Sequence, residues 1–259
     1  MTNRTQVRDG LKTFQRNLVS AKAHEKGWSF GPNEDHVEAQ FKTLLFGSAG
    51  LVGDTEVIKA AQEMFASFAK GDANAIHPNI RASVYAIALD NGGAEEFDTI
   101  LAEYKKASDA DKRNTALRAL GRVKTPELIE RVLALPLSDD VKNQDIYMPL
   151  LGLRTNTQGV EALWGWLTGN WEEITKRCPP GLTMLGTLVK LCTAEFTTQE
   201  QLETVQKFFE DKDKAGYKMA LEQSLDSIRA RIGWVKRDRE DVVRFLQEEE
   251  LLGGKEGKL

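Results

Sequence analysis

The stretch T-E-V-I-K-A-A-Q-E-M-F-A-S-F-A-K, residues 55–70, carries the pattern that predicts the fold. Its apolar residues recur at spacings of one, three, three, one and three, which places them on one face of an α-helix. They are Val57, Ile58, Ala61, Met64, Phe65 and Phe68. Asp54 precedes the stretch as an expected N-cap, and Gly71 follows it at the C′ position, where a left-handed backbone is common. The stretch therefore predicts an amphipathic helix with both ends marked.

Comparable patterns recur along most of the chain. Thr125 and Pro126 predict an N-cap and a first helical residue, and Thr197 and Glu200 have the spacing of a capping box. Residues 217–235 repeat an apolar side chain every three or four positions. Strand-like alternation bounded by hairpin turns is not found. We therefore predict an all-α protein of roughly a dozen helices, stacked as antiparallel pairs into an irregular α-solenoid of the HEAT or armadillo type.

Composition narrows the classes of protein to which the chain can belong. Its 259 residues are 41% hydrophobic and 29% charged, with a net charge of -4, which is typical of a globular protein. The mild acidity argues against a nucleic-acid partner, and no segment approaches the roughly 18 apolar residues of a membrane span. We expect no membrane partner, a cytoplasmic location, and one helical domain over 1–250 followed by a flexible tail over 251–259. Two cysteines, Cys178 and Cys192, are too few for a disulfide scaffold and are expected as reduced thiols.

The search for catalytic motifs is negative. The segment beginning His24-Glu25 approaches a zinc-protease helix, but Trp28 stands where the second histidine ligand is required. The remaining histidines, His36 and His77, have no ligand-like neighbours. We therefore expect no catalytic residue and no metal site in this chain.

Two arginines and a tyrosine are the candidate binding residues. Arg122 and Arg154 each follow an apolar helical segment and a glycine. An arginine at such a helix end often donates to the last carbonyls, or it faces a groove and binds a carboxylate in a forked geometry. Tyr147 lies about two helical turns before Arg154 and would share that groove. The tryptophans, in contrast, are expected in the core: Trp164, Trp166 and Trp171.

Eight short segments together resemble one protein family. They are G-W-S-F (27–30), L-L-F-G-S-A-G (44–50), L-R-A-L-G-R (117–122), N-Q-D-I-Y (143–147), E-A-L-W-G-W-L-T-G-N-W (161–171), K-R-C-P-P-G-L (176–182), E-F-T-T (195–198) and W-V-K-R-D-R (234–239). In this order and spacing they resemble the C-terminal helical domain of gluzincin zinc aminopeptidases, which include the puromycin-sensitive, alanyl and endoplasmic-reticulum enzymes. The likeness runs from about Leu11 to Leu246 and is strongest to cytosolic fungal members.

The resemblance implies a function without catalysis. The family's zinc ligands, exopeptidase loop and transition-state tyrosine belong to an upstream domain, and this chain has none of those motifs. The expected partners are therefore that zinc-bearing catalytic domain and peptide substrates, with the chain capping the active-site cavity and selecting peptide length. Arg122 resembles the family position that reaches a peptide carboxylate, and Arg154 resembles a less consistent one. A stand-alone α-solenoid interaction module is the alternative.

The beginning of the chain carries an unexplained apolar face. Leu11, Phe14 and Leu18 fall on one side of a predicted helix. The family's domain begins with further helices that this sequence lacks. We expect the face to pack on those helices, or to mediate self-association.

Overall fold

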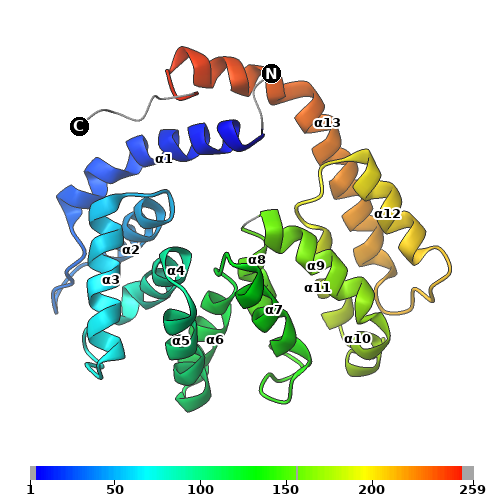
Figure 1. The fold of residues 1–259 in the computed structure, drawn as a ribbon, viewed down its shortest axis with the longest axis horizontal. Helices are drawn as coiled ribbons and strands as arrows, with labels where there is room; N and C mark the ends of the chain where they lie inside the picture. Colours follow the sequence, from blue (N-terminus) through cyan, green and yellow to red (C-terminus); the bar gives the residue numbers. More distant parts are fainter. Residues whose placement is uncertain (1–3, 156, 253–259) are drawn as a thin grey trace. The chain divides into compact units, whose positions relative to one another are not determined.

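The computed structural model describes residues 4–155 and 157–252, and these residues form helices and turns without a β-strand (Figure 1). The all-α prediction is confirmed. Contacts divide the chain into two compact units, the first up to Gly92 and from Asp238 on, the second between them. None of the described helices is long and apolar enough to cross a membrane. The single-domain boundary stays a prediction, and residues 253–259 of the predicted tail lie outside the described part.

The first unit contains four α-helices and a 3-10 turn. They are α1 (Arg4–Lys26), α2 (His36–Leu51), α3 (Thr55–Ala69), η1 (Pro78–Ile80) and α4 (Arg81–Asn91), joined by the end of α13 (Lys218–Glu248). Helix α2 packs against both α1 and α4, and α3 packs against α4 (Figure 1). The predicted face of α3 contributes to the core, because Val57 and Ala61 are fully buried. The Phe65 ring meets the Tyr85 ring edge-on, with ring centroids 6.1 Å apart.

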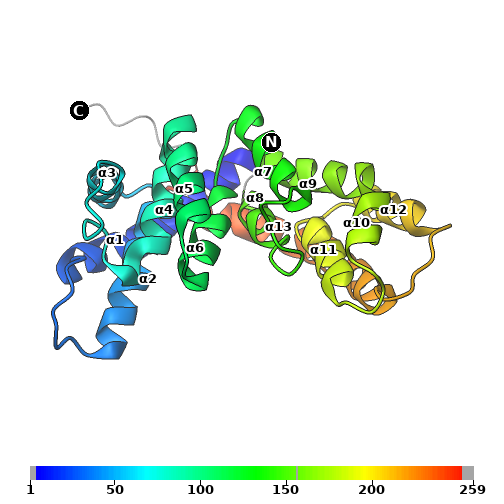
Figure 2. The same ribbon diagram turned by 90° about the horizontal axis from the view of Figure 1, so that it is seen from below.

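The second unit contains the remaining helices. They are α5 (Ala94–Lys106), α6 (Ala110–Leu120), α7 (Pro126–Ala134), η2 (Leu135–Leu137), α8 (Met148–Leu153), α9 (Thr157–Gly169), α10 (Trp171–Arg177), α11 (Met184–Thr193), α12 (Gln199–Phe209) and the start of α13. Helices α5 and α6 lie side by side, as Figure 2 shows, and α6 continues the packing onto α8. Helix α9 contacts α7, α8 and α11, so that the short α8 lies among neighbours on several sides.

Most predicted helix ends are found where the sequence puts them. The Asp54 carboxylate accepts from the Val57 amide at 3.0 Å, and Gly71 has a φ of 104° just beyond α3. The capping box was predicted one residue too early, because Thr198, not Thr197, caps α12. Its hydroxyl accepts from the Gln201 amide at 3.2 Å, and the Gln201 side chain accepts from the Thr198 amide at 3.1 Å.

Two glycines allow α6 and α8 to touch through their backbones. A Cβ atom added to Gly121 would lie 2.3 Å from the Pro149 oxygen, and one added to Gly152 would lie 2.4 Å from the Gly121 carbonyl carbon. Only a residue without a side chain fits at either position. This contact fixes the place of α8, whose two ends carry the candidate binding residues Tyr147 and Arg154.

Of the three tryptophans expected in the core, Trp166 is buried in the second unit, and Trp164 and Trp171 are half-buried. Trp166 is 6% exposed, and the Trp171 ring contacts Phe209 edge-on at 5.2 Å. Cys178 and Cys192 are free, buried thiols, as predicted. Burial raises the pKa of Cys192 well above its ordinary value, so this thiol stays neutral and is a poor nucleophile.

The apolar face of α1 is only partly covered. Phe14 meets Phe245 of α13 edge-on, with ring centroids 5.3 Å apart. Leu11 and Leu18 remain 43% and 64% exposed. The predicted face is therefore present in the first unit, and its partner stays a prediction.

Candidate functional site

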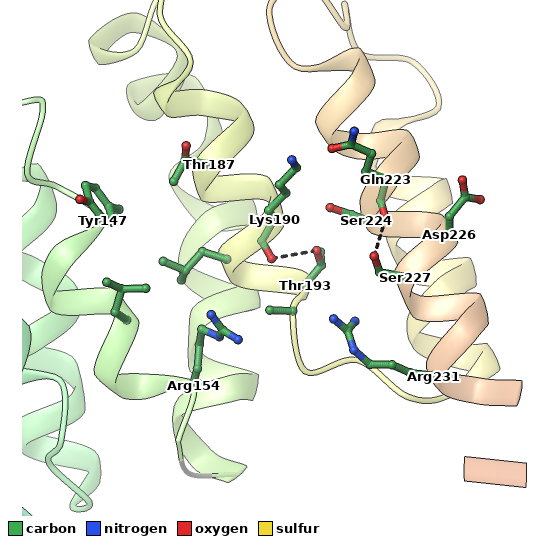
Figure 3. Close-up of a pocket in the computed structure, with 13 residues that line it drawn as sticks. Tyr147, Arg154, Thr187, Lys190, Thr193, Gln223, Ser224, Asp226, Ser227 and Arg231 are labelled. Atoms are coloured by element: carbon green, nitrogen blue, oxygen red, sulfur yellow. Dashed lines mark hydrogen bonds between the residues drawn. The ribbon is translucent and has the colours of Figure 1, made fainter. Parts of the chain in front are cut away.

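The second unit holds a cavity of about 750 Å³ bounded by α8, α11 and α13 (Figure 3). Its lining side chains come from Tyr147 to Arg154, from Thr187 to Ala194 and from Gln223 to Arg231. The described lining includes three cations, Arg154, Lys190 and Arg231, one carboxylate, Asp226, and amide, hydroxyl and aliphatic groups. Such a surface suits recognition of an anionic ligand rather than bond cleavage.

Two of the sequence-predicted residues lie on the same wall of this cavity. Tyr147 is the residue before α8 and Arg154 is the residue after it, and Pro149 occupies the first turn between them. Because α8 is only six residues long, both helix ends reach the cavity. Arg122 follows α6 instead, where its amide donates to the Ala119 oxygen at 2.8 Å, and it is not among the described residues that line this cavity.

The Arg154 guanidinium is partly engaged. Its Nη2 donates to Glu195 Oε1 at 2.8 Å, and both side chains are more than a third exposed. Its Nε is buried and has no hydrogen-bond partner among the described residues. A forked guanidinium can bind a second acceptor while it holds the first. Because Nε is buried and Nη2 is bound to Glu195, the donor that Arg154 retains toward the cavity is Nη1.

The wall formed by α13 supplies a second guanidinium that sequence reasoning missed. In Figure 3 the Arg231 side chain extends from α13 toward Arg154, with Thr193 of α11 near the space between them. The sequence does contain a signal, because Ser224, Ser227 and Arg231 recur at three and four positions along a predicted amphipathic helix. That spacing indicates a polar stripe, but it does not reveal that the stripe faces α8 and α11.

Serine and threonine hydroxyl groups of the lining donate hydrogen bonds to backbone carbonyls of their own helices. Thr193 Oγ1 donates to the Val189 oxygen at 2.8 Å, Ser224 Oγ to the Ala220 oxygen at 2.8 Å, and Ser227 Oγ to the Gln223 oxygen at 2.7 Å. A hydroxyl has a single proton to donate. The donors left for an anion are therefore the N–H groups of the arginines, of Lys190 and of the Gln223 side chain, together with the Tyr147 hydroxyl.

Arg177, at the end of α10, holds the segment that leads into Tyr147. Its Nε donates to Asn143 Oδ1 at 2.6 Å, and its Nη2 donates to the carbonyls of Ser138 and Val141 at 2.9 and 2.6 Å. Three acceptors on one planar fork fix the backbone between η2 and α8. The start of the cavity wall thus depends on a residue outside it.

The histidine nearest to a zinc motif has a structural role. His24 Nε2 lies 3.0 Å from Asp54 Oδ1, so the imidazole pairs with the carboxylate that caps α3. Among the described residues no group of three histidine, cysteine or acidic side chains is arranged to hold a metal ion.

Residues 1–230 match the family described as the ERAP1-like C-terminal domain. Among similar proteins, Aminopeptidase 2 of Candida albicans is 42% identical over 245 residues, and mitochondrial Aminopeptidase 2 of Saccharomyces cerevisiae is 39% identical over 243 residues. Each alignment covers 94% of this chain and 26% of the relative. Aminopeptidase M1-B of rice is 27% identical over 235 residues, which are 89% of this chain. The chain thus spans about a quarter of the length of these relatives.

Proposed function

Because the chain belongs to the ERAP1-like C-terminal domain family, we propose that it acts as the non-catalytic C-terminal domain of a zinc aminopeptidase. In this role it caps the active-site cavity of the catalytic portion, binds peptide substrates and contributes to selection by peptide length. The names of the similar proteins support the aminopeptidase assignment. Zinc belongs to the catalytic portion in this proposal, and the cytoplasmic location stays a prediction.

The observation that carries the peptide-binding part is the cavity with Tyr147 and Arg154 on one wall. An aminopeptidase substrate has a free carboxylate at the end that is not cleaved. The Arg154 guanidinium lines the cavity with its Nη2 bound to Glu195, and its second terminal nitrogen, Nη1, can donate to that carboxylate. Tyr147, half-buried at the other end of α8, adds a phenol group and an aromatic surface to the same wall. Arg122 is proposed as a further carboxylate contact on the basis of the family resemblance.

The capping role is tested by combining this chain with the catalytic portion of a related aminopeptidase. We expect the rate of cleavage of an aminoacyl reporter, and its dependence on peptide length, to change when the chain is added. A chain carrying Leu18→Glu on the exposed face of α1 serves as a comparison, because it removes apolar surface without touching the cavity. Cleavage that is unaffected by the chain at every peptide length would contradict the capping role.

The carboxylate role is tested by direct binding. We expect Arg154→Gln to weaken binding of peptides with a free C-terminus more than binding of the same peptides with an amidated C-terminus. Loss of one charge-assisted hydrogen bond costs about 1.5–3 kcal/mol. Arg122→Ala is expected to show the same preference. Equal losses for free and amidated peptides would contradict the role of the arginine concerned, and Arg244→Gln, an exposed arginine paired with Asp241 away from the cavity, is the matched control.

A further inference from the structure

Arg231 and Lys190 are cations of the cavity lining that form no ion pair among the described residues, whereas Arg154 is paired with Glu195. The Nη1 of Arg231 is buried without a hydrogen-bond partner among the described residues. A buried guanidinium nitrogen without an acceptor is costly, because its desolvation is not repaid. An anion in the cavity cannot reach the buried Nη1, but it can accept from the other nitrogens of the Arg231 guanidinium.

Two acidic groups at the cavity, Asp226 and the Arg154 partner Glu195, are already paired. Asp226, on the same helix as Arg231, binds Arg229 at 2.8 Å, and in Figure 3 its carboxylate is turned away from Arg154. Glu195 binds Arg154 at 2.8 Å. Lys190 adds a further positive charge to the lining. A single carboxylate bound at Arg154 would therefore still leave Arg231 without a counter-charge.

We propose that Arg231 is a specificity-determining residue that selects peptides whose last residue carries an acidic side chain. This inference rests on the proposed peptide-binding function. The terminal carboxylate occupies the Arg154 side, and the side-chain carboxylate of a C-terminal glutamate or aspartate occupies the Arg231 side. The two carboxylates of such a residue belong to one amino acid, so both can enter one cavity of about 750 Å³. In an extended peptide the penultimate side chain points to the opposite face, so an acid at that position gains nothing.

The test is a set of short peptides measured by isothermal titration calorimetry against the full chain. The peptides end in glutamate or glutamine, each with a free or an amidated C-terminus, and one further peptide has glutamate at the penultimate position and a C-terminal glutamine. For the wild type we expect glutamate to bind at least about tenfold more tightly than glutamine at the last position, the lower end of one charge-assisted hydrogen bond. We expect the penultimate glutamate to give no such gain.

The variants separate this inference from the proposed function. In Arg231→Gln the preference for C-terminal glutamate should disappear while the preference for a free over an amidated C-terminus remains. Arg231→Lys should restore part of the glutamate preference, because the charge is kept, and Arg244→Gln, an exposed arginine away from the cavity, should leave both preferences unchanged. Equal thermal unfolding midpoints would show that Arg231→Gln is folded, and if that variant unfolds, the Arg231→Lys protein and the wild-type peptide series still decide the question.

Each outcome has a defined consequence. A free-carboxylate preference without a glutamate preference, or a glutamate preference that survives in Arg231→Gln, overturns the role of Arg231 and leaves the proposed function standing. Equal binding of free and amidated peptides overturns the carboxylate site itself. No binding of any peptide by the wild type overturns both.

Discussion

The backbone contact between α6 and α8 makes a quantitative prediction about Gly152→Ala. The added Cβ would lie 2.4, 2.7 and 2.8 Å from the carbonyl carbon, Cα and oxygen of Gly121. These are backbone atoms, so no side-chain rotation relieves the contact and the helices must separate. Overpacking costs about 1–3 kcal/mol, and a backbone obstacle places the cost at the upper end. Alanine returns about 1 kcal/mol through its helix propensity. We therefore expect the free energy of unfolding to fall by about 2 kcal/mol, and Tm to fall by about 4 to 8 °C.

Gly165→Ala in α9 is the matched control. This glycine is also inside a helix, but it is exposed and an added Cβ would meet nothing within 4 Å. Helix propensity alone predicts that the protein becomes more stable by up to about 1 kcal/mol. Urea unfolding followed by circular dichroism compares the two variants with the wild type. If Gly152→Ala unfolds at the same urea concentration as Gly165→Ala, the close approach of α6 and α8 is refuted, and with it the basis for the position of Arg154.

Three further predictions concern regions outside the cavity. Arg177→Lys keeps the charge but loses the fork that binds Asn143 and two carbonyls, and it should lower the free energy of unfolding by about 2 kcal/mol in urea titrations; an unchanged midpoint would contradict this. The hydrogen bond to Asp54 raises the pKa of His24 above its ordinary 6.5, so the pair stabilises the fold below that pH and this contribution is lost as pH rises through the folded-state pKa. The stability difference between wild type and His24→Gln should accordingly be larger at about pH 5.5 than at about pH 8.5, and a constant difference would disprove the coupling. If the α1 face self-associates, light scattering should show that Leu18→Glu lowers the molar mass of the wild-type chain toward that of a monomer; equal masses would exclude this face as the contact.

The pKa of Asp54 shifts in the opposite direction to that of His24, so its contribution to stability depends on pH in the opposite way. Burial alone would raise the pKa of the Asp54 carboxyl, but the hydrogen bonds that it accepts, including those from the Val57 amide and His24, outweigh burial and lower it below 3.8. The contribution of Asp54 is therefore present above that pH and is lost as pH falls through the folded-state value. The pair as a whole stabilises the first unit most strongly between the ordinary pKa values of the two groups, 3.8 and 6.5.

Local signals in the sequence predict the helices well, because each helix end is decided by residues close to it. Asp54, Thr125 and Gly71 act on amides and carbonyls within a few positions, and they mark the ends of α3 and α7 as expected. The error at Thr197 has the same local origin. Thr197 and Thr198 each carry a hydroxyl that could cap the helix. Glu200 and Gln201 each carry a side chain that could accept from the amide of the capping residue, and the structure uses Thr198 with Gln201.

The cavity is harder to predict, because it depends on which helices meet. Tyr147 and Arg154 flank one short helix, so their common wall follows from sequence spacing. Arg231 lies 77 residues further along and is found only when α13 is placed across from α8 and α11. Arg177 lies in one of the segments that resemble the family. Its hydrogen bond to Asn143, in the loop before Tyr147, is visible only in the tertiary structure.

Arg122 and Arg154 each follow a glycine at the end of an apolar helix, but their distances from that glycine differ by one residue. Arg122 directly follows Gly121, whereas Arg154 lies two residues after Gly152, and the two glycines are the points at which α6 and α8 touch. One residue corresponds to a rotation of about 100° around a helix. Two arginines offset by one position from a shared contact point therefore leave it in different directions. This accounts for the presence of Arg154, and not Arg122, in the cavity lining, and it favours α8 over α6 as the helix that meets the carboxylate of a peptide bound there.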